Sequence, residues 1–374
     1  YAFPTDVVPL KILSSKNLSE GVDLNRELSR AISEYAPGSK IIANSRIYTS
    51  KALHKFPTQE FEQYYYYHCL NCGDFYINKE RKKVVELKKD HISECSNDDN
   101  SQTKKAIYPK WGFAVPRNTK DDRNGSNEEK IKISTIRNRS SYSSDLFINE
   151  DSDNINLTDE KNIFINSVLD INLKYFSGYN MYRISSSSYN ICKDCGSEVS
   201  TKSKTKKHST PYGYSCNNTG IIEDARLLSI FDTDIVRFKF KISMSLDNFS
   251  FDKSFNLSLL YTLLESISQV MEIERKDLDG MYKLVVDAEI PDLILIDAVS
   301  GGAGHVSRLI GKGNENPKEL IEKILLKSIE ISNCKYCNSN TACYSCLFHY
   351  SNQKYQHLLN RGIVYKFLSS IKIR

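Results

Sequence analysis

An α+β fold is predicted by three features of the 374-residue sequence. Short runs rich in β-branched and aromatic residues alternate with a few apolar stripes at helical spacing. Near the C-terminus, the aliphatic run Leu293–Asp297 leads into a glycine-rich turn and then a helical pattern. The ten cysteines fall into three clusters with the spacing of metal ligands, inserted between these elements.

Periodicity places the elements in chain order. The first part of the chain is predicted to hold a helix, a hairpin and a strand, over Asp23–Tyr35, Lys40–Lys51 and Phe61–Tyr67. Aromatic strands are predicted next over Lys174–Ser187, followed by an alternating strand over Asp234–Leu246 with lysines on one face. Those lysines indicate either a solvated face or a nucleic-acid contact. The last elements are a helix, a short strand and a second helix, over Leu257–Ile273, Lys283–Asp287 and Pro317–Ser332.

Length and composition set outer limits. The chain is long enough for two or three domains with a real core. Its formal charge of +5 permits nucleic-acid binding without requiring it. No apolar run approaches the roughly 20 residues of a membrane helix, so no membrane partner is expected. Because the chain begins with Tyr1 rather than Met, we expect it to be the C-terminal portion of a longer protein.

Composition also suggests how the chain is divided. We predict an N-terminal part over residues 1–117, a polar flexible linker over 118–160 and a C-terminal domain over 161–374. The linker is rich in Asn, Asp, Ser and Lys, which is typical of exposed loops.

The cluster nearest the C-terminus has the strongest metal-binding pattern. Cys334-x-x-Cys337 is followed, after five residues, by Cys343-x-x-Cys346. Four thiolates at this spacing can surround one tetrahedral zinc at about 2.3 Å, leaving no open position for water, so the site is predicted to be structural. Two disulfides or four free core cysteines are the alternative, and they would suit a secreted protein better.

The first cluster along the chain lies in the N-terminal part. Cys69-x-x-Cys72 follows the predicted strand, and His91-x3-Cys95 completes a set of finger-like spacing, which predicts another zinc site. The plain interpretation is a cross-linked hairpin that braces the fold. A finger helix that reads DNA is the alternative.

The second cluster along the chain combines Cys192-x-x-Cys195 with Cys216, and His208 is the predicted fourth ligand. Up to three zinc ions are therefore expected, and metal clusters of this kind predict a reducing, cytoplasmic compartment. The loop inside this cluster is rich in lysine. It is either a solvated loop or, through Lys206 and Lys207, a contact for DNA phosphate.

The glycine-rich turn after Asp297 has strand–turn–helix form, with Gly301, Gly302 and Gly304 before His305. Backbone N–H groups at such a turn can hold a phosphate, and Arg308 would add charge. No Lys-Ser/Thr follows the glycines, so ATP binding is not expected. The glycines either allow close strand–helix packing or contact an anion such as DNA phosphate.

A nuclease is the rival from another functional class. Asp287, Glu289, Asp297 and His305 could hold Mg²⁺ at the ends of strands. Of these, Asp297 and His305 are the candidate catalytic residues. Acidic residues after strands are common, however, and no restriction-nuclease pattern or Ser/His/Asp arrangement is present.

Taken together, the order of motifs resembles a known family. The motifs are AISEYAPG, YPKWGF, CxxCG with a later His and Cys, MEIERKDLDG, LILIDAVSGGAGH, and CxxC-x5-CxxCL followed by N-x4-HLLNR. The chain is similar, from Leu24 to about Phe367, to the domain-of-unknown-function family that ends MrfA-type DEAD/DEAH-box helicases. The same family supplies the free-standing DrmB subunit of the DISARM anti-phage system.

This resemblance implies a zinc-binding, non-catalytic accessory to a superfamily 2 helicase that helps it engage DNA. Its four C-terminal cysteines bind metal, which we carry over to the motif at 334–346 only. The partner would be a DrmA-like helicase subunit or helicase domains upstream in the same chain. Three cysteine clusters favour the DrmB type, and hence restriction of phage DNA, over the tail of a MrfA-type DNA-repair helicase.

Overall fold

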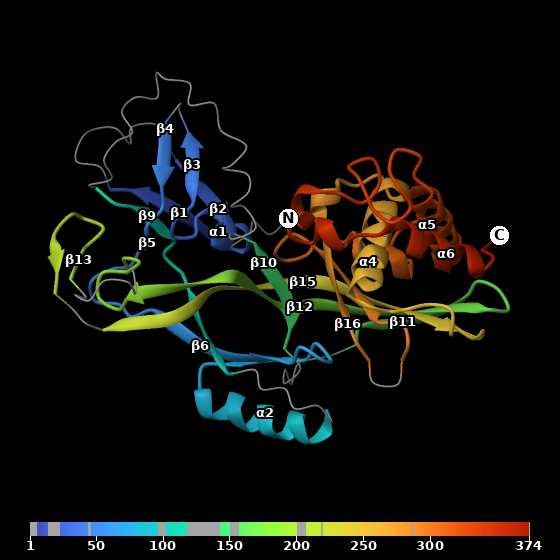
Figure 1. The fold of residues 1–374 in the computed structure, drawn as a ribbon, viewed down its shortest axis with the longest axis horizontal. Helices are drawn as coiled ribbons and strands as arrows, with labels where there is room; N and C mark the ends of the chain where they lie inside the picture. The colour runs from blue at the N-terminus through green and yellow to red at the C-terminus, as the bar shows by residue number, and fades with distance from the viewer. Residues whose placement is uncertain are drawn as a thin grey trace. The chain divides into compact units, whose positions relative to one another are not determined.

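The computed structural model describes residues 6–13, 23–43, 46–95, 102–117, 143–149, 157–199, 207–217, 220–285 and 288–373. Strands and helices are both present in quantity, so the predicted α+β class is confirmed (Figure 1). Among the described residues, no helix has the length and apolar character needed to cross a bilayer.

The strands are β1 Val7–Ile12, β2 Asn25–Glu27, β3 Lys40–Ala43, β4 Arg46–Thr49, β5 Ala52–Leu53, β6 Glu62–His68, β7 Phe75–Asn78, β8 Lys104–Tyr108, β9 Phe113–Val115, β10 Ser144–Ile148, β11 Asp159–Phe164, β12 Leu169–Cys192, β13 His208–Ser209, β14 Ser215–Cys216, β15 Ile221–Ile242, β16 Leu278–Lys283 and β17 Asp292–Asp297. The α-helices are α1 Leu28–Glu34, α2 Arg81–Glu94, α4 Lys253–Val270, α5 Pro317–Ser332 and α6 Arg361–Ser370, and the 3₁₀ helices are η3 Arg275–Asp277, η4 Val306–Ile310 and η5 Tyr350–Leu358.

The chain forms two compact units. Unit 1 contains Tyr1–Cys69, Phe75–Asp151 and Met181–Phe231, and unit 2 contains Leu70–Asp74, Ser152–Asn180 and Asp232–Arg374. The long strands β12 and β15 contribute residues to both. Most of the predicted linker over 118–160 lies outside the described residues, and its described part contains β10. The three-part division of the chain therefore stays a prediction.

Two larger sheets and the two-stranded sheets β3-β4 and β13-β14 have strands in unit 1. In one larger sheet, the order is β2-β1-β9-β5, and in the other the strands of this unit run β10-β12-β15-β8-β6-β7. The predicted hairpin over Lys40–Lys51 is confirmed as β3 and β4, with Ile42 opposite Ile47. The predicted helix over Asp23–Tyr35 begins only at Leu28, because Asn25–Glu27 pairs with β1 instead.

Helix α2 was not predicted, and its sequence explains why. Charged residues occupy most of its length, and Val84 and His91 are its only buried side chains among those described. A helix with so narrow an apolar stripe gives little periodic signal.

Unit 2 holds a larger apolar core. Its helices α4, α5 and α6 pack with β11, β12, β15 and β17 around a cluster that includes Leu263, Leu264, Ile324 and Phe367, all fully buried. Figure 1 shows these three helices together in orange and red. Strand β17 pairs with β16 and β15, and all six of its residues are buried. The predicted strand over Lys283–Asp287 is wrong in its bounds, because β16 ends at Lys283, where the prediction begins. Asp287 lies outside the described residues.

Hydroxyl groups line the contact between α4 and α5. Thr262 and Ser266 on α4, and Ser328 and Ser332 on α5, are fully buried, and each hydroxyl donates to a carbonyl one turn earlier in its own helix at 2.7–2.8 Å. Ser328 Oγ also lies 2.9 Å from Ser266 Oγ, so its single proton is shared between that oxygen and the Ile324 carbonyl. Every buried hydroxyl in this seam is therefore satisfied, as burial of polar groups requires.

Candidate metal centres

The four C-terminal cysteines converge on one point directly after helix α5. The sulfur atoms of Cys334, Cys337, Cys343 and Cys346 all lie within 4.8 Å of one another. Neighbouring pairs are separated by 3.8–3.9 Å, which is the edge of about 3.8 Å expected for four thiolates around tetrahedral zinc. All four are free rather than paired in disulfides. This donor set and geometry fit a closed structural zinc site.

Hydrogen-bond donors surround this centre, which we call the knuckle (residues 334–346). The N–H of Tyr336 points to Cys334 Sγ at 3.4 Å, and the N–H of Cys343 points to Cys346 Sγ at 3.2 Å. Four thiolates outweigh one Zn²⁺, leaving net negative charge on the sulfurs. Donors aimed at sulfur spread that charge and hold the ligands in place.

Arg361 is a cation that contacts a knuckle sulfur directly. Its Nε donates to Cys337 Sγ at 3.3 Å, and its two terminal nitrogens donate to the carbonyls of Cys337 at 2.6 Å and Ser332 at 2.9 Å. The residue is 9% exposed. No ion pair to a carboxylate is formed by Arg361 within the part of the chain that the structure describes. The sulfur-rich centre is therefore the anion that this buried guanidinium faces.

Without metal, two of the four knuckle thiols favour the protonated state more strongly than a free thiol does. Burial raises the pKa of Cys346 and also that of Cys337, where the Arg361 hydrogen bond acts in the opposite direction. Burial would also raise the pKa of Cys343, but hydrogen bonds to its sulfur, that of Ser345 first, together lower it. Zinc binds thiolates, so its uptake must release these protons.

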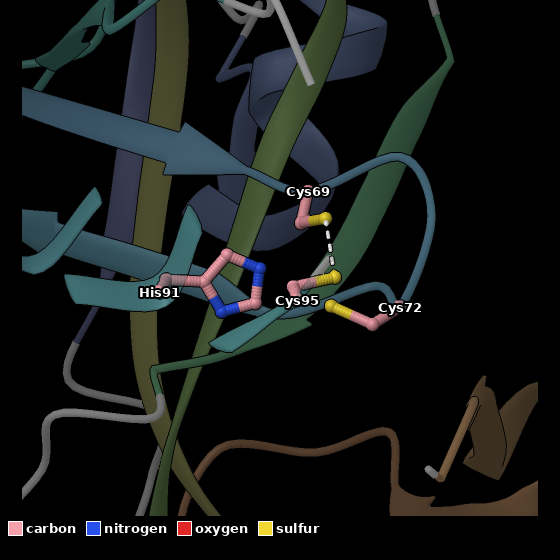
Figure 2. Close-up of side chains that lie close together, drawn as sticks. All are labelled: Cys69, Cys72, His91 and Cys95. Atoms are coloured by element: carbon pink, nitrogen blue, oxygen red, sulfur yellow. Dashed lines mark hydrogen bonds between the residues drawn. The ribbon is translucent and has the colours of Figure 1, made fainter. Parts of the chain in front are cut away.

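The first cluster joins a β-hairpin to a helix (Figure 2). Cys69 follows β6 and Cys72 lies in the turn before β7, while His91 projects from α2 and Cys95 follows its end. The four ligand atoms lie within 4.8 Å of one another, with 3.9 Å between the sulfurs of Cys69 and Cys95. This strand–strand–helix arrangement holds three sulfurs and one imidazole, a donor set that suits structural zinc.

The His91 ring packs beside two aromatic rings that also stack on each other. The ring centroids of Tyr67 and Tyr76 lie 5.9 Å and 5.7 Å from that of His91 and 6.4 Å from each other, and the Tyr76 hydroxyl lies 3.5 Å from His91 Nδ1. A contact at Nδ1 orients the ring and leaves Nε2 for the metal.

The second cluster, Cys192, Cys195, His208 and Cys216, lies where the end of β12 and the turn after it meet a short two-stranded sheet. Cys192 ends β12, while His208 and Cys216 pair directly in β13 and β14. The sulfurs of Cys192 and Cys216 are 3.9 Å apart, and Cys195 Sγ lies 3.1 Å from His208 Nε2. The structure thus brings His208 together with the three sulfurs. Burial raises the pKa of Cys195 to about 12.

A glycine holds this cluster against the neighbouring strand. Gly196 has φ of +76°, and a Cβ there would come within 2.1 Å of the Leu53 carbonyl oxygen, so only glycine fits. Leu53 also donates its N–H to the Gly196 carbonyl at 2.9 Å. Lys207, beside His208, is exposed; Lys206 lies outside the described residues.

The glycine turn is organised by Asp297. This fully buried carboxylate accepts the N–H groups of Ala303 at 2.8 Å, His305 at 3.1 Å and Val306 at 2.9 Å. Burial raises the pKa of Asp297, and these N–H donors oppose that shift. The N–H groups that would hold a phosphate are thus occupied by a side chain of the protein itself.

The remaining candidates around this turn are likewise engaged. A Cβ on Gly302 would lie 2.9 Å from Asp234 Cγ, so the turn packs closely on β15. Gly301 donates its N–H to the Asp232 carbonyl at 2.7 Å, and a Cβ on Gly304 would meet nothing nearer than 3.9 Å. Arg308 pairs with Glu315 and donates to the Met271 carbonyl at 3.2 Å.

No carboxylate centre for a catalytic cation is formed in the described ranges. There, the only groups of three or more His, Cys, Asp or Glu side chains that converge on one point are the three cysteine clusters. Glu289 is exposed, and Asp287 lies outside the described residues. Both oxygens of Asp297 are bonded to backbone N–H groups, which leaves them poorly placed for Mg²⁺.

Comparison with known proteins gives one family match. Residues 259–347, which include most of α4, the glycine turn, α5 and the knuckle, match the family described as MrfA Zn-binding domain. The chain is also 23% identical to Druantia protein DruE of Escherichia coli (strain UMEA 4076-1), over 97% of this chain and 20% of that protein. The chain thus spans a fifth of the length of this relative.

Two solved structures share limited similarity with the chain. A crystal structure of the DUF1998 helicase MrfA bound to DNA is 11% identical, with a TM-score of 0.31 over 62% of this chain and 25% of that one. MrfA bound to DNA and AMPPNP gives a TM-score of 0.24 over 57% and 22%. These scores are too low to establish a common fold.

Proposed function

We propose that the chain is a zinc-stabilised, non-catalytic accessory region of a superfamily 2 DNA helicase, and that it helps the helicase engage DNA. The observation that carries the proposal is the closed four-cysteine knuckle inside the segment that matches the MrfA Zn-binding domain. Such a site has no open coordination position, so its role is to shape a small lobe rather than to activate water.

The charge of the C-terminal segment supports a nucleic-acid role. After Glu330 the chain has no Asp or Glu, and its basic residues there are Lys335, Lys354, Arg361, Lys366, Lys372 and Arg374. A segment without carboxylates that surrounds the knuckle favours contact with a polyanion over contact with a basic partner.

The motor would come from elsewhere, because the sequence has no Walker A motif or DEAH box. We propose bacterial anti-phage defence as the setting, on the resemblance to DrmB subunits, with a DrmA-like helicase as partner. A helicase in the same polypeptide, as in MrfA-type repair enzymes, is the second form of this proposal. Ten free thiols suit a cytoplasmic location.

A binding and cleavage assay tests the proposal. We expect the zinc-loaded chain to bind DNA with an affinity that falls steeply with salt, and to cut none in Mg²⁺ or Mn²⁺. Failure to bind any DNA at low salt would contradict the proposal. So would metal-dependent cutting that Asp297→Asn abolishes while the melting temperature is unchanged, since this would establish the rival nuclease.

A further inference from the structure

Three exposed tyrosines lie within the knuckle or shortly after it in the chain. Tyr336 is 83% exposed, Tyr344 71% and Tyr350 62%, and Tyr336 is the most exposed large apolar side chain in the described part of the chain. Tyr336 lies inside the first CxxC turn and Tyr344 inside the second. Because both turns place their sulfurs around one point, these two rings project from a single small lobe.

The backbone that carries these rings is held in place. Arg361 and Gly362 donate their N–H groups to the carbonyls of Thr341 at 3.2 Å and Ser339 at 2.8 Å, in the loop between the two CxxC turns. A Cβ on Gly362 would come within 2.5 Å of the Ser339 carbonyl oxygen, so this approach requires glycine. Cys346 and Leu347 are buried in the core of unit 2. The lobe is therefore held at the loop between its two turns and at its C-terminal end.

One ring is also supported from the side. Tyr344 packs edge-to-face against Phe348, with 5.5 Å between ring centroids. Tyrosine has only two side-chain torsions, so ordering it against a ligand costs little entropy. A fixed backbone and a buttressed ring together make a preformed contact surface.

The charge around the rings is suited to phosphate. Lys335 adjoins Tyr336 in the first turn and is exposed, with no ion pair among the described residues. Lys354 lies in η5, which begins at Tyr350. No carboxylate follows Glu330 in the sequence, so the negative charge of this segment is that of the knuckle thiolates, which the buried Arg361 faces.

We propose that the exposed rim of the knuckle, formed by Tyr336, Tyr344 and Tyr350 with Lys335, is a stacking platform for the bases of single-stranded DNA. Unstacked bases pack on aromatic faces without regard to sequence, while nearby lysines contact the backbone. Bases inside a duplex present no free faces to these rings. This inference rests on the proposed function and specifies the form of DNA that the knuckle takes.

The test is fluorescence anisotropy of labelled oligothymidine with the zinc-loaded 374-residue chain. We expect Tyr336→Ala and Tyr344→Ala each to weaken binding by about fivefold or more, because one stacked base contributes on the order of 1–3 kcal/mol. Tyr→Phe at the same positions should retain the affinity, since stacking needs the ring and not the hydroxyl. Lys335→Gln should lower the slope of log K against log salt by about 0.7.

Tyr214→Ala is the matched control. Tyr214 is 68% exposed and lies two residues from a cysteine of another cluster, so its loss should leave strand binding unchanged. Zinc content and melting temperature of each variant separate a lost contact from a lost fold.

The outcomes distinguish the two proposals. Binding to DNA that none of the tyrosine changes affects would overturn the platform and leave the proposed function standing; loss of association with an ATPase in those variants would then assign the rim to a protein partner. No binding to any DNA would overturn the proposed function itself. Equal loss in the Tyr→Phe variants would also overturn stacking.

Discussion

The knuckle and the first cluster use metal in different ways. All four knuckle ligands lie within residues 334–346, next to a core that contains many fully buried side chains of unit 2. The first cluster instead gathers a hairpin turn and the far end of α2, a helix with few buried residues. We infer that metal binding holds α2 to its hairpin, because few apolar side chains are buried there. At the knuckle the apolar core is already extensive, so metal binding only fixes the conformation of a loop.

The largest effect should come from breaking the first cluster. His91→Ala or Cys72→Ser removes a ligand, and α2 has little else to hold it, so we expect amide exchange in α2 to rise to that of an unfolded segment. In Cys346→Ser, by contrast, exchange should rise in the knuckle while α4 and α5 remain protected. Hydrogen-exchange mass spectrometry measures both. If the amides of α2 stay protected from exchange after the first cluster loses its metal, the proposed difference between the first cluster and the knuckle is wrong.

Proton release on metal uptake should differ between the two kinds of centre. The thiol pKa values of the metal-free knuckle are raised by burial at Cys337 and Cys346, so the zinc-loaded state holds fewer protons than the metal-free state. Zinc affinity must then fall as pH falls. Between pH 7 and 8 a four-thiol centre can release up to four thiol protons, and a three-thiol centre up to three. Chelator competition at several pH values measures the two slopes; equal slopes would contradict this prediction.

Removing the knuckle's guanidinium should have a moderate effect. Arg361→Met keeps much of the side-chain volume but leaves the sulfurs without their cation, and we expect zinc affinity at the knuckle to drop by about 10- to 100-fold. The other two centres, which hold one thiolate fewer, should not change. Zinc release to a chromophoric chelator measures the zinc affinity of each centre. Arg361→Lys should restore part of the affinity lost at the knuckle. A uniform loss at all three centres would point to general unfolding instead.

The smallest effect is expected from the hydroxyl beside His91. Tyr76→Phe removes a long contact of 3.5 Å to Nδ1 and keeps the ring packing, so zinc affinity at the first cluster should fall by less than about tenfold. The same chelator assay detects it. A drop as large as that of His91→Ala would mean that the hydroxyl, rather than the two rings, orients the imidazole.

Spacing in the sequence was enough to group the cysteines. The CxxC pairs predict which thiols meet, because a two-residue turn brings both sulfurs to the same side, and His91 and His208 are placed with them in the structure. Helix α2 escaped prediction because tertiary contact with a hairpin and the cluster, not an apolar stripe, holds it. The contact of Arg361 with Cys337 joins residues 24 positions apart and leaves no local pattern.

For the glycine turn, by contrast, the sequence could not predict which group its N–H donors bind. Its sequence favours either close packing or contact with an anion such as phosphate. In the structure Asp297, which ends β17, accepts the turn's own N–H groups. A carboxylate supplied by the chain and one supplied by a ligand satisfy the same donors. Only the folded geometry distinguishes them.

The hydroxyl seam between α4 and α5 has a mechanical consequence. Each hydroxyl keeps its main bond inside its own helix, and only the bond from Ser328 to Ser266 crosses the contact. An axial shift of α5 would disturb this polar contact together with the buried aliphatic side chains beside it, among them Leu263, Leu264 and Ile324. Since only Asn333 separates α5 from the knuckle, the helix contact sets the position from which the zinc lobe leaves the core of unit 2.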